Sequence, residues 1–279
     1  WLVGINATRL FSVLYHRTLN VGRVQTPTLS LLAARDAKIA LFQKEKYHHV
    51  RLTLAGAEAV SERFTDPAEA EQAAAMRKGA TVTCTSVTCE QKKEQPPKLY
   101  DLTTLQREAN RLLGYTAKQT LDYAQSLYEK KLLTYPRTDS RYLTSDMAET
   151  ASCVIHLAAK LPPFDGCTNF FPLVEAMASD KDVSDHHAII PTLEIEKADI
   201  PALPLGEREL LLLICCRLLC ASAEPYVYEA VTATFGCGGH SFTAKGRRVL
   251  SEGWREIDRI FRASLKEKPA DRSEEHTSE

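Results

Sequence analysis

The stretch KKLLTYPRTDSRY, Lys130 to Tyr142, lies near the middle of the 279-residue chain. It places a tyrosine, arginines, an aspartate and hydroxyl side chains directly behind an apolar pair. Pro136 disfavours the helical conformation in the residue before it, so the helical pattern that leads into the stretch should end at Tyr135. The phenol of Tyr135 then projects from an extended turn. Because positions i and i+2 share a face in an extended chain, Arg137 can lie beside it.

These side chains suit chemistry on a phosphate ester. A phenol ordinarily has a pKa near ~10, so it is a poor nucleophile at neutral pH unless a cation stabilises its phenolate. The planar guanidinium of Arg137 suits bidentate binding of a phosphate. Asp139 can orient an arginine or a helix start, and Ser140 can cap a helix. The stretch thus fits a nucleophilic tyrosine that attacks a phosphodiester. Residue types alone favour the alternative, a loop with a half-buried tyrosine and solvated charges, because short motifs often match by chance.

The stretch SDHHAIIPT, Ser184 to Thr192, holds two adjacent histidines between an acidic residue and an apolar run that leads to a proline. A metal site is disfavoured, because no H-x-x-H spacing occurs and adjacent side chains on a strand point to opposite faces. Two interpretations stay open. Either one histidine binds or orients a phosphate or transfers a proton, or it is a structural histidine with satisfied hydrogen bonds.

The stretch NVGRVQTP, Asn20 to Pro27, combines residues that suit contact with a nucleic acid. Gly22 allows close approach of the backbone, and Arg23 supplies a positive charge. The amide of Gln25 can hydrogen-bond a base or sugar, and the N-terminus of the helix that follows favours anions. The alternative is a helix-capping loop with one solvated arginine.

Together these stretches resemble the type IA DNA topoisomerases, most closely the bacterial topoisomerase III branch. The motif TYPRTDSRYL is highly specific, and four matching segments follow one another in the order of the family, from Trp1 to about Trp254. A single motif could match by chance, but four in order outweigh the alternatives given above. The segments are LVGINATRLFSVLYHRTLNVGRVQTPTLSLL, PPKLYDLTTLQREANRLLGYTAKQTLDYAQSLYEKKLLTYPRTDSRYLT, VSDHHAIIPT and CGGHSFTAKGRRVL.

The resemblance implies a role for each matching residue. Tyr135 matches the nucleophile that attacks a single DNA strand and holds its 5′ phosphate covalently. Arg137 matches the arginine that positions and neutralises the scissile phosphate. His186, rather than His187, aligns with the active-site histidine of the family. The DNA-contacting residues implied in the same way are Arg9, Asn20, Val21, Gly22, Arg23, Val24, Gln25, Asp139 and Arg141.

The implied fold is multidomain α+β: winged-helix-like helical domains joined by a β-rich gate arch, forming part of a torus that is incomplete in this chain. Short successive helices with basic residues from about Leu102 to Leu161 also suggest a winged-helix or helix-turn-helix unit, although that signal alone is weak. The expected divisions are residues 1–44 in the DNA-groove domain, 45–91 in the outgoing arch, 92–224 in the tyrosine-bearing domain, 225–261 in the returning gate strands and 262–279 in a truncated end.

The resemblance also implies the reaction and its partners. A phosphotyrosine conserves the energy of the phosphodiester, so strands pass and reseal without ATP, which agrees with the lack of a phosphate-binding G-x-x-x-x-G-K-[ST] loop in the sequence. The implied substrate is single-stranded DNA. The intact enzyme is expected to use Mg²⁺, and no metal is expected to bind this segment. We expect a monomer in the bacterial cytoplasm, associated with the nucleoid.

Two departures from the family pattern limit what this segment should do. The Toprim domain, whose glutamate and acidic cluster bind Mg²⁺, precedes these segments in the family, and the later half of the torus follows them. We therefore interpret the chain as a fragment, and expect it to cleave DNA poorly alone. Its last residues, RSEEHTSE at 272–279, match the translation of a sequencing adapter and are expected to be a scar.

Three other classes of protein are alternatives to a type IA topoisomerase. The runner-up is a non-catalytic DNA-binding remnant with a winged-helix fold and an inert tyrosine. Tyrosine recombinases surround their tyrosine with an H-x-x-R motif, and relaxases use a three-histidine metal cluster. No three histidines lie close together in this sequence, and its one H-x-x-R spacing, from His48 to Arg51, lies far before Tyr135.

Charge and cysteine content agree with an intracellular protein that binds a polyanion. The net charge is −1, but residues 1–46 hold seven Lys/Arg against two Asp/Glu, and residues 91–141 hold ten against six. Such segregation fits a localised polyanion site, although small counts allow chance clustering. None of the eight cysteines forms a C-x-x-C pair, so we expect reduced, buried thiols. No apolar run is long enough for a membrane helix, and no signal peptide is found.

Periodicity and capping residues predict the elements around these motifs. The expected helices cover Leu29–Leu41, Pro67–Lys78 with Asp66 as N-cap, Leu102–Leu113 ended by Gly114, Ala117–Lys130 with Thr116 as N-cap, Thr144–Leu161 and Leu205–Ser222. The expected strands cover Lys46–Leu54, Ala80–Glu90 and a hairpin from Tyr226 to Leu250 that turns at GCGG. Two prolines and several charges predict an irregular linker over Gln91–Leu102, with a domain boundary near Lys92.

Overall fold

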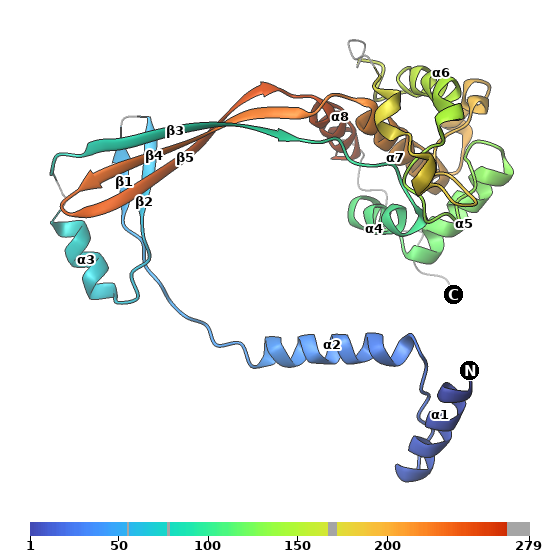
Figure 1. The fold of residues 1–279 in the computed structure, drawn as a ribbon, viewed down its shortest axis with the longest axis horizontal. Helices are drawn as coiled ribbons and strands as arrows, with labels where there is room; N and C mark the ends of the chain where they lie inside the picture. Colours follow the sequence, from blue (N-terminus) through green and yellow to red (C-terminus); the bar gives the residue numbers. More distant parts are fainter. Residues whose placement is uncertain (55, 77–78, 167–171, 267–279) are drawn as a thin grey trace. The chain divides into compact units, whose positions relative to one another are not determined.

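The computed structural model describes residues 1–54, 56–76, 79–166 and 172–266, so the predicted scar at 272–279 lies outside the described residues. The chain divides into two compact units (Figure 1). Unit 1 contains residues 1–83 and 236–242, and unit 2 contains residues 84–235 and 243–279.

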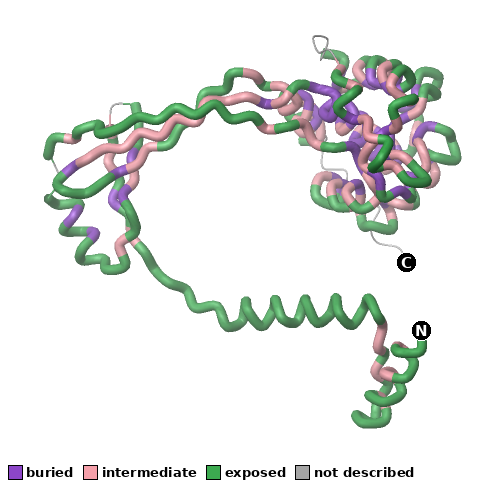
Figure 2. Tube along the Cα trace, in the orientation of Figure 1, coloured by how far each residue is buried: buried purple, intermediate pink, exposed green. Residues whose placement is uncertain are grey.

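Unit 1 begins with two helices, α1 (Leu2–Leu14) and α2 (Gln25–Ala40), that bury none of their residues. Figure 2 shows α2 exposed along its whole length. The helix predicted from Leu29 is confirmed but begins earlier, at Gln25, so Pro27 occupies its first turn. There the missing N–H of a proline breaks no helical hydrogen bond. Helix α1 was not predicted, although it lies in a segment matched by resemblance.

The rest of unit 1 is a small α/β region. Strands β1 (Arg51–Leu54) and β2 (Ala57–Ser61) pair antiparallel, with Arg51 opposite Val60. Helix α3 (Pro67–Ala75) begins as predicted, because the Asp66 carboxylate accepts a hydrogen bond from the Ala68 N–H at 2.8 Å. It ends at Ala75, earlier than predicted.

Three long strands belong to one five-stranded sheet of order β1-β2-β5-β4-β3. They are β3 (Thr83–Glu94), β4 (Tyr226–Cys237) and β5 (His240–Ser251). The predicted hairpin is confirmed: β4 and β5 join at Gly238 and Gly239, whose φ angles of 55° and 80° suit glycine in a two-residue turn. The predicted linker from Gln91 is wrong in its first part, because β3 continues to Glu94 and the irregular chain begins only beside the prolines.

Helix α8 (Trp254–Lys266), which was not predicted, holds the base of these strands within unit 2. The Trp254 indole N–H donates to the Glu94 carbonyl at 3.2 Å, at the end of β3. The Arg255 guanidinium pairs with the Glu94 carboxylate and lies 4.3 Å from the ring centre of Tyr226, at the start of β4. Gly253 has φ 46° and packs against the Pro225 carbonyl, where a side chain would clash.

The core of unit 2 is helical, and Figure 2 shows buried residues concentrated there. Both caps predicted for its first helices are confirmed: Gly114 ends one helix with φ 78°, and the Thr116 hydroxyl caps the next in a capping box. The long apolar helix is buried nearly all round, from Leu210 to Ser222 except Leu212 and Arg217. The four helices are α4 (Leu102–Leu113), α5 (Ala117–Glu129), α6 (Ala148–Ala158) and α7 (Leu205–Ser222).

Short 3₁₀ turns connect these helices. The helix predicted over Thr144–Leu161 instead starts as a 3₁₀ turn and becomes α-helical at Ala148, ending at Ala158. The turns are Ser145–Met147, Val174–Met177, Asp180–Asp182, Leu193–Glu196 and Ile200–Ala202.

The prediction of buried thiols is correct for one group of cysteines only. Burial raises the pKa of the Cys215 thiol to about 12, which makes the reactive thiolate scarce at neutral pH. Among the described residues, the buried free cysteines are Cys215, Cys216, Cys220 and Cys237, and the exposed ones are Cys84, Cys89 and Cys153. Strand β3, which carries the first two, is exposed along nearly all its length, so their burial was wrongly predicted. No helix within the described part of the chain is both long and apolar enough to cross a membrane.

Candidate functional site

The tyrosine segment leaves α5 earlier than predicted. The helix ends at Glu129 because Lys131 adopts a left-handed conformation, with φ 61°. The Lys131 N–H then bonds the Tyr128 carbonyl and the Leu132 N–H bonds the Leu127 carbonyl, both at 2.8 Å. This pattern is a Schellman motif, completed by burial of both leucines. A helix that runs to Tyr135 is therefore a wrong prediction: the chain is already extended there.

The extended segment runs beside the loop that carries the two histidines. Leu133 forms an isolated antiparallel bridge with Pro191, and the Thr134 N–H donates to the Ile190 carbonyl at 3.0 Å. Farther along, the Ala188 N–H donates to the Tyr142 carbonyl at 2.9 Å. Two stretches that are about fifty residues apart in sequence are thus fixed together.

This pairing places the ring of Tyr135 between two other rings. The centre of the His186 ring lies 4.4 Å from that of Tyr135, with the planes tilted by 44°. The Tyr128 ring, on the last turn of α5, lies 5.6 Å away in an edge-on arrangement. The Tyr135 side chain is half-buried, whereas His186 is exposed. The phenol is therefore held by aromatic contacts next to an imidazole that solvent or a ligand can reach.

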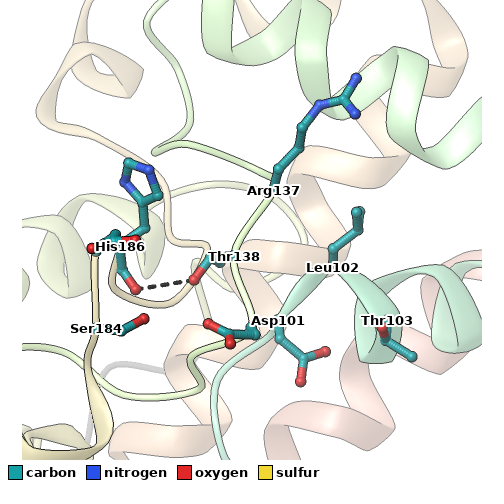
Figure 3. Close-up of a pocket in the computed structure, with 9 residues that line it drawn as sticks. Asp101, Leu102, Thr103, Arg137, Thr138, Ser184 and His186 are labelled. Atoms are coloured by element: carbon teal, nitrogen blue, oxygen red, sulfur yellow. Dashed lines mark hydrogen bonds between the residues drawn. The ribbon is translucent and has the colours of Figure 1, made fainter.

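A pocket of about 510 Å³ opens beside this pair, at the N-terminus of α4. In Figure 3 the His186 ring and the Arg137 guanidinium lie apart from each other, and both point away from the carboxylate of Asp101. Among the described residues that line it, Arg137 alone is a permanent cation, so an anion in the pocket would meet that guanidinium. The lining residues are Asp101, Leu102, Thr103, Arg137, Thr138, Asp139, Ser184, Asp185 and His186.

Arg137 was expected to lie beside the phenol of Tyr135, but among the described residues the two side chains are linked only through His186. In the described part of the chain, the rings of Tyr128 and His186 contact the Tyr135 ring, and the Arg137 guanidinium makes no such contact. Arg137 is exposed and shares the pocket with His186. His186 therefore connects the phenol to the pocket in which Arg137 lies.

The other predicted residues of this segment have different environments. Asp139 is exposed and lines the pocket. Ser140 caps no helix, because its hydroxyl donates to the Asp182 carbonyl at 2.9 Å. The Arg141 Nε–H donates to the Leu99 carbonyl at 3.1 Å, so this half-buried arginine ties the segment to the chain before α4.

The loop before the histidines is held by a carboxylate. Both oxygens of Asp180 accept hydrogen bonds from Ser145, one from its N–H and one from its hydroxyl, each at 2.7 Å. These two bonds hold the pKa of Asp180 below its usual value. The second histidine, His187, has its ring Nδ1 2.8 Å from the Ala188 carbonyl oxygen, so this ring contacts its own loop.

The predicted loop Asn20–Gln25 is built on α1, within unit 1. The Thr8 hydroxyl on α1 accepts a hydrogen bond from the Val21 N–H at 2.9 Å. A pocket of about 500 Å³ lies along it, lined by Trp1, Gly4, Ile5, Thr8, Arg9, Asn20, Val21, Gly22 and Arg23. The predicted residues Val24 and Gln25 instead form the exposed start of α2, as its N-cap and first residue.

A magnesium site does not fit the described residues. Although three carboxylates line the pocket beside Arg137, no group of three or more His, Cys, Asp or Glu side chains in the described ranges is placed to hold a metal ion. Two acids of the stretch at 179–185 are instead engaged in hydrogen bonds: Asp180 accepts from Ser145, and Asp182 accepts from the Ser179 hydroxyl.

Sequence reasoning missed Tyr128 and two threonines. Tyr128 lies seven residues before Tyr135, a spacing that carries no signal until the Schellman turn brings the two rings together. Thr134 accepts a hydrogen bond from the Ile190 N–H, and Thr138 donates one to the His186 carbonyl, both at 3.0 Å. The only sequence signal was the presence of hydroxyl residues inside the motif.

Comparison with known proteins gives one consistent result. A family model described as DNA topoisomerase matches residues 1–277. The chain is 38% identical to DNA topoisomerase 3 of Shouchella clausii over 273 residues, covering 91% of this chain and 37% of that protein. It is 37% identical to DNA topoisomerase 3 of Bacillus licheniformis over 269 residues, again covering 37% of the relative.

A solved structure agrees with this result. The full-length topoisomerase I of Thermotoga maritima matches with a TM-score of 0.67 and 25% identity, over 86% of this chain and 40% of the other. The chain spans little more than a third of the length of the curated relatives that it matches. The predicted resemblance is confirmed, and the chain belongs to the DNA topoisomerase family, with the type IA enzymes as its structural relatives.

Proposed function

We propose that this chain carries the strand-cleaving tyrosine of a type IA DNA topoisomerase. The observation that carries the proposal is the contact between Tyr135 and His186, 4.4 Å between ring centres, beside the pocket lined by Arg137. A nucleophile, a group that can exchange protons and a cation are the components that phosphoryl transfer to an enzyme requires. The family membership supports the same assignment.

In the proposed reaction, the phenol oxygen of Tyr135 attacks the phosphorus of one DNA strand. A bond forms between that oxygen and phosphorus while the bond from phosphorus to the 3′ oxygen breaks. The phenol loses its proton, and the leaving 3′ oxygen gains one and becomes a hydroxyl. The products are a 5′-phosphotyrosine and a free 3′-OH, and resealing reverses each of these changes. No oxidant, reductant or ATP is consumed.

Two side chains assist this step in the proposal. The Arg137 guanidinium binds the non-bridging oxygens of the scissile phosphate and offsets charge that develops there. The imidazole of His186 hydrogen-bonds the reacting oxygens or transfers the proton between them. A requirement for Mg²⁺ is proposed for the whole enzyme, and no step is assigned to the ion, since the described residues supply no site for it.

The remaining parts of the proposal concern DNA handling. The pocket lined by Arg9 and residues 20–23 contacts the single strand that is fed to the tyrosine, and Asp139 and Arg141 flank the scissile phosphate. A winged-helix character of the helical core, a β-rich gate arch, assembly into a torus and action as a monomer belong to the same proposal. Strand passage through the cleaved strand then changes DNA topology.

The test replaces the matching segment of the Bacillus licheniformis relative with residues 2–266 of this chain. The chimera is incubated with a single-stranded oligonucleotide labelled at its 3′ end, the end that stays on the tyrosine. The reaction is quenched with SDS, and the covalent adduct is measured on a gel. We expect an adduct with Tyr135 intact and none with Tyr135→Phe. The isolated chain is expected to form far less adduct than the chimera.

The matched control is Tyr128→Phe, which keeps an aromatic ring against Tyr135 and removes a different hydroxyl. It should fold and retain the adduct. An adduct that persists in Tyr135→Phe contradicts the assignment of the nucleophile. DNA binding without any adduct in the unmodified chimera would favour the second candidate, a non-catalytic DNA-binding segment.

A further inference from the structure

Thr138 joins three segments that meet at the pocket. Its side chain is 7% exposed, and its hydroxyl donates to the His186 carbonyl at 3.0 Å (Figure 3). The same oxygen accepts the Ser140 N–H at 3.1 Å. The Thr138 carbonyl accepts the N–H of Leu102, the first residue of α4, at 3.1 Å. One buried residue thus binds the histidine loop, the tyrosine segment and α4.

The imidazole of His186 depends on its backbone for its position. Its side chain is exposed, and in the described part of the chain its ring contact is with Tyr135, without a side-chain hydrogen bond to fix it. The neighbouring ladder bonds hold residues 188 and 190, farther along the loop. Within the described ranges, the hydrogen bond from Thr138 is the one that holds residue 186 itself.

We propose that Thr138 is a positioning residue for His186. Its hydroxyl fixes the carbonyl of residue 186, and this keeps the imidazole against the Tyr135 ring and at the rim of the pocket that Arg137 lines. The structural part stands on the contacts above, whereas its effect on DNA cleavage rests on the proposed function. Thr138 does not touch the reacting atoms, so it acts through His186.

A purely structural role is the competing explanation, because loss of the hydroxyl also leaves the buried Ser140 N–H without its acceptor. The two explanations differ in one respect. A structural role predicts a less stable protein with an unchanged His186 environment, whereas a positioning role predicts that the imidazole leaves the Tyr135 ring even in a folded protein. Thr138→Val removes the hydroxyl at nearly constant volume, and Thr138→Ser restores it.

The experiment uses the whole chain with ¹³C-labelled histidine and measures the ring-proton shifts by NMR at a temperature where all variants are folded. The His186 signal is identified by its loss in His186→Gln. A neighbouring aromatic ring at 4.4 Å displaces this signal from the position of an exposed histidine. We expect Thr138→Val to lose that displacement and Thr138→Ser to keep it.

Thr120→Val is the matched control. Thr120 is fully buried in α5, and its hydroxyl also donates to a backbone carbonyl, that of Thr116 at 2.9 Å, but it has no link to the histidine loop. This variant should lose stability and leave the His186 signal unchanged. Should Thr138→Val fail to fold by circular dichroism, Thr138→Cys takes its place, because a thiol is only a weak donor.

An unchanged His186 signal in folded Thr138→Val overturns the proposal, and so does a signal that moves equally in Thr138→Ser. In the chimera, Thr138→Val should slow adduct formation by about 10²-fold with little change in oligonucleotide binding, and Thr138→Ser should restore the rate. The NMR result does not require cleavage. A shifted His186 signal in a chimera that never cleaves would therefore count against the proposed function and not against the positioning of His186.

Discussion

The loop at Asn20–Gln25 and the turn that carries Tyr135 both come from specific sequence motifs, but different structures support them. Beneath the turn lie Leu133 and Leu143, 2% and 1% exposed, and a ladder of hydrogen bonds to the histidine loop. The other loop rests on α1 and α2, which bury no residue, and is tethered through Thr8. A motif therefore identifies reactive or binding residues, whereas the packing around it decides how firmly they are held.

The largest difference should appear when a leucine is shortened in each unit. Leu211→Ala in α7 removes a side chain that is 0% exposed and should cost about 2–5 kcal/mol of unfolding free energy, because a cavity remains. Leu31→Ala in α2, where the side chain is 74% exposed, should change it by no more than about 0.5 kcal/mol. Urea unfolding followed by far-UV circular dichroism measures both. Equal losses would mean that α2 packs against other parts of this chain in solution.

Two helical glycines give a smaller contrast. A Cβ on Gly206, at the start of α7, would lie 2.5 Å from the ring of Tyr123, so Gly206→Ala should cost about 1–3 kcal/mol through overpacking. A Cβ on Gly4 in α1 would lie 3.2 Å from the Val21 carbonyl, a mild contact that the gain in helix propensity, about 0.5–1 kcal/mol, should offset. Thermal unfolding monitored by circular dichroism distinguishes the two. A Gly4→Ala loss as large as that of Gly206→Ala would show that the α1–loop contact is rigid.

Arginines in the two regions test whether both touch DNA. If each neutralises one phosphate of a single strand, Arg137→Ala and Arg23→Ala should each reduce the magnitude of the negative slope of log binding constant against log salt by about 0.7. The double variant should lose about twice that. Fluorescence anisotropy of a labelled oligonucleotide with the whole chain, measured at several salt concentrations, gives the slopes. If only one substitution changes the slope, only one of the two regions contacts the strand.

The smallest expected effect concerns pH and the loop before the histidines. The two bonds from Ser145 hold the pKa of Asp180 below that of the unfolded chain. Such a group adds stability above its unfolded pKa, and the contribution is lost as the pH falls through its lower folded pKa. Ser145→Ala should raise the pKa of Asp180 toward its ordinary value. Carboxyl ¹³C NMR titration measures the change, and an unaltered titration would mean that Ser145 does not bind Asp180 in solution.

Local sequence rules predicted the elements whose ends depend on their own residues. Asp66, Gly114 and Thr116 were identified as caps because each satisfies or ends a helix through chemistry within a few positions. The hairpin turn at Gly238 and Gly239 was predicted for the same reason. These features need no knowledge of the rest of the fold.

The errors arose where distant contacts decide the structure. Lys131 ends α5 in a left-handed conformation because Leu127 and Leu132 are both buried, which outweighs the proline signal farther on. Strand β3 continues to Glu94 despite its charges, because it lies in the sheet beside β4. Candidate residues in the tyrosine and histidine stretches could be named from the motifs, but the bond from Thr138 joins positions 48 residues apart. No local pattern shows such a pair.

The contacts of α8 bear on how the three long strands could move. Glu94 on β3 and Tyr226 on β4 are both held by Arg255, and Gly253 follows β5 directly into the same helix. Tension on any one strand therefore reaches α8, and through its packing on α7 reaches the helical core. The ends of β3, β4 and β5 at α8 should therefore move together and not independently. We expect any bending to occur in the parts of the three strands that lie away from α8, or through a tilt of α8 against α7.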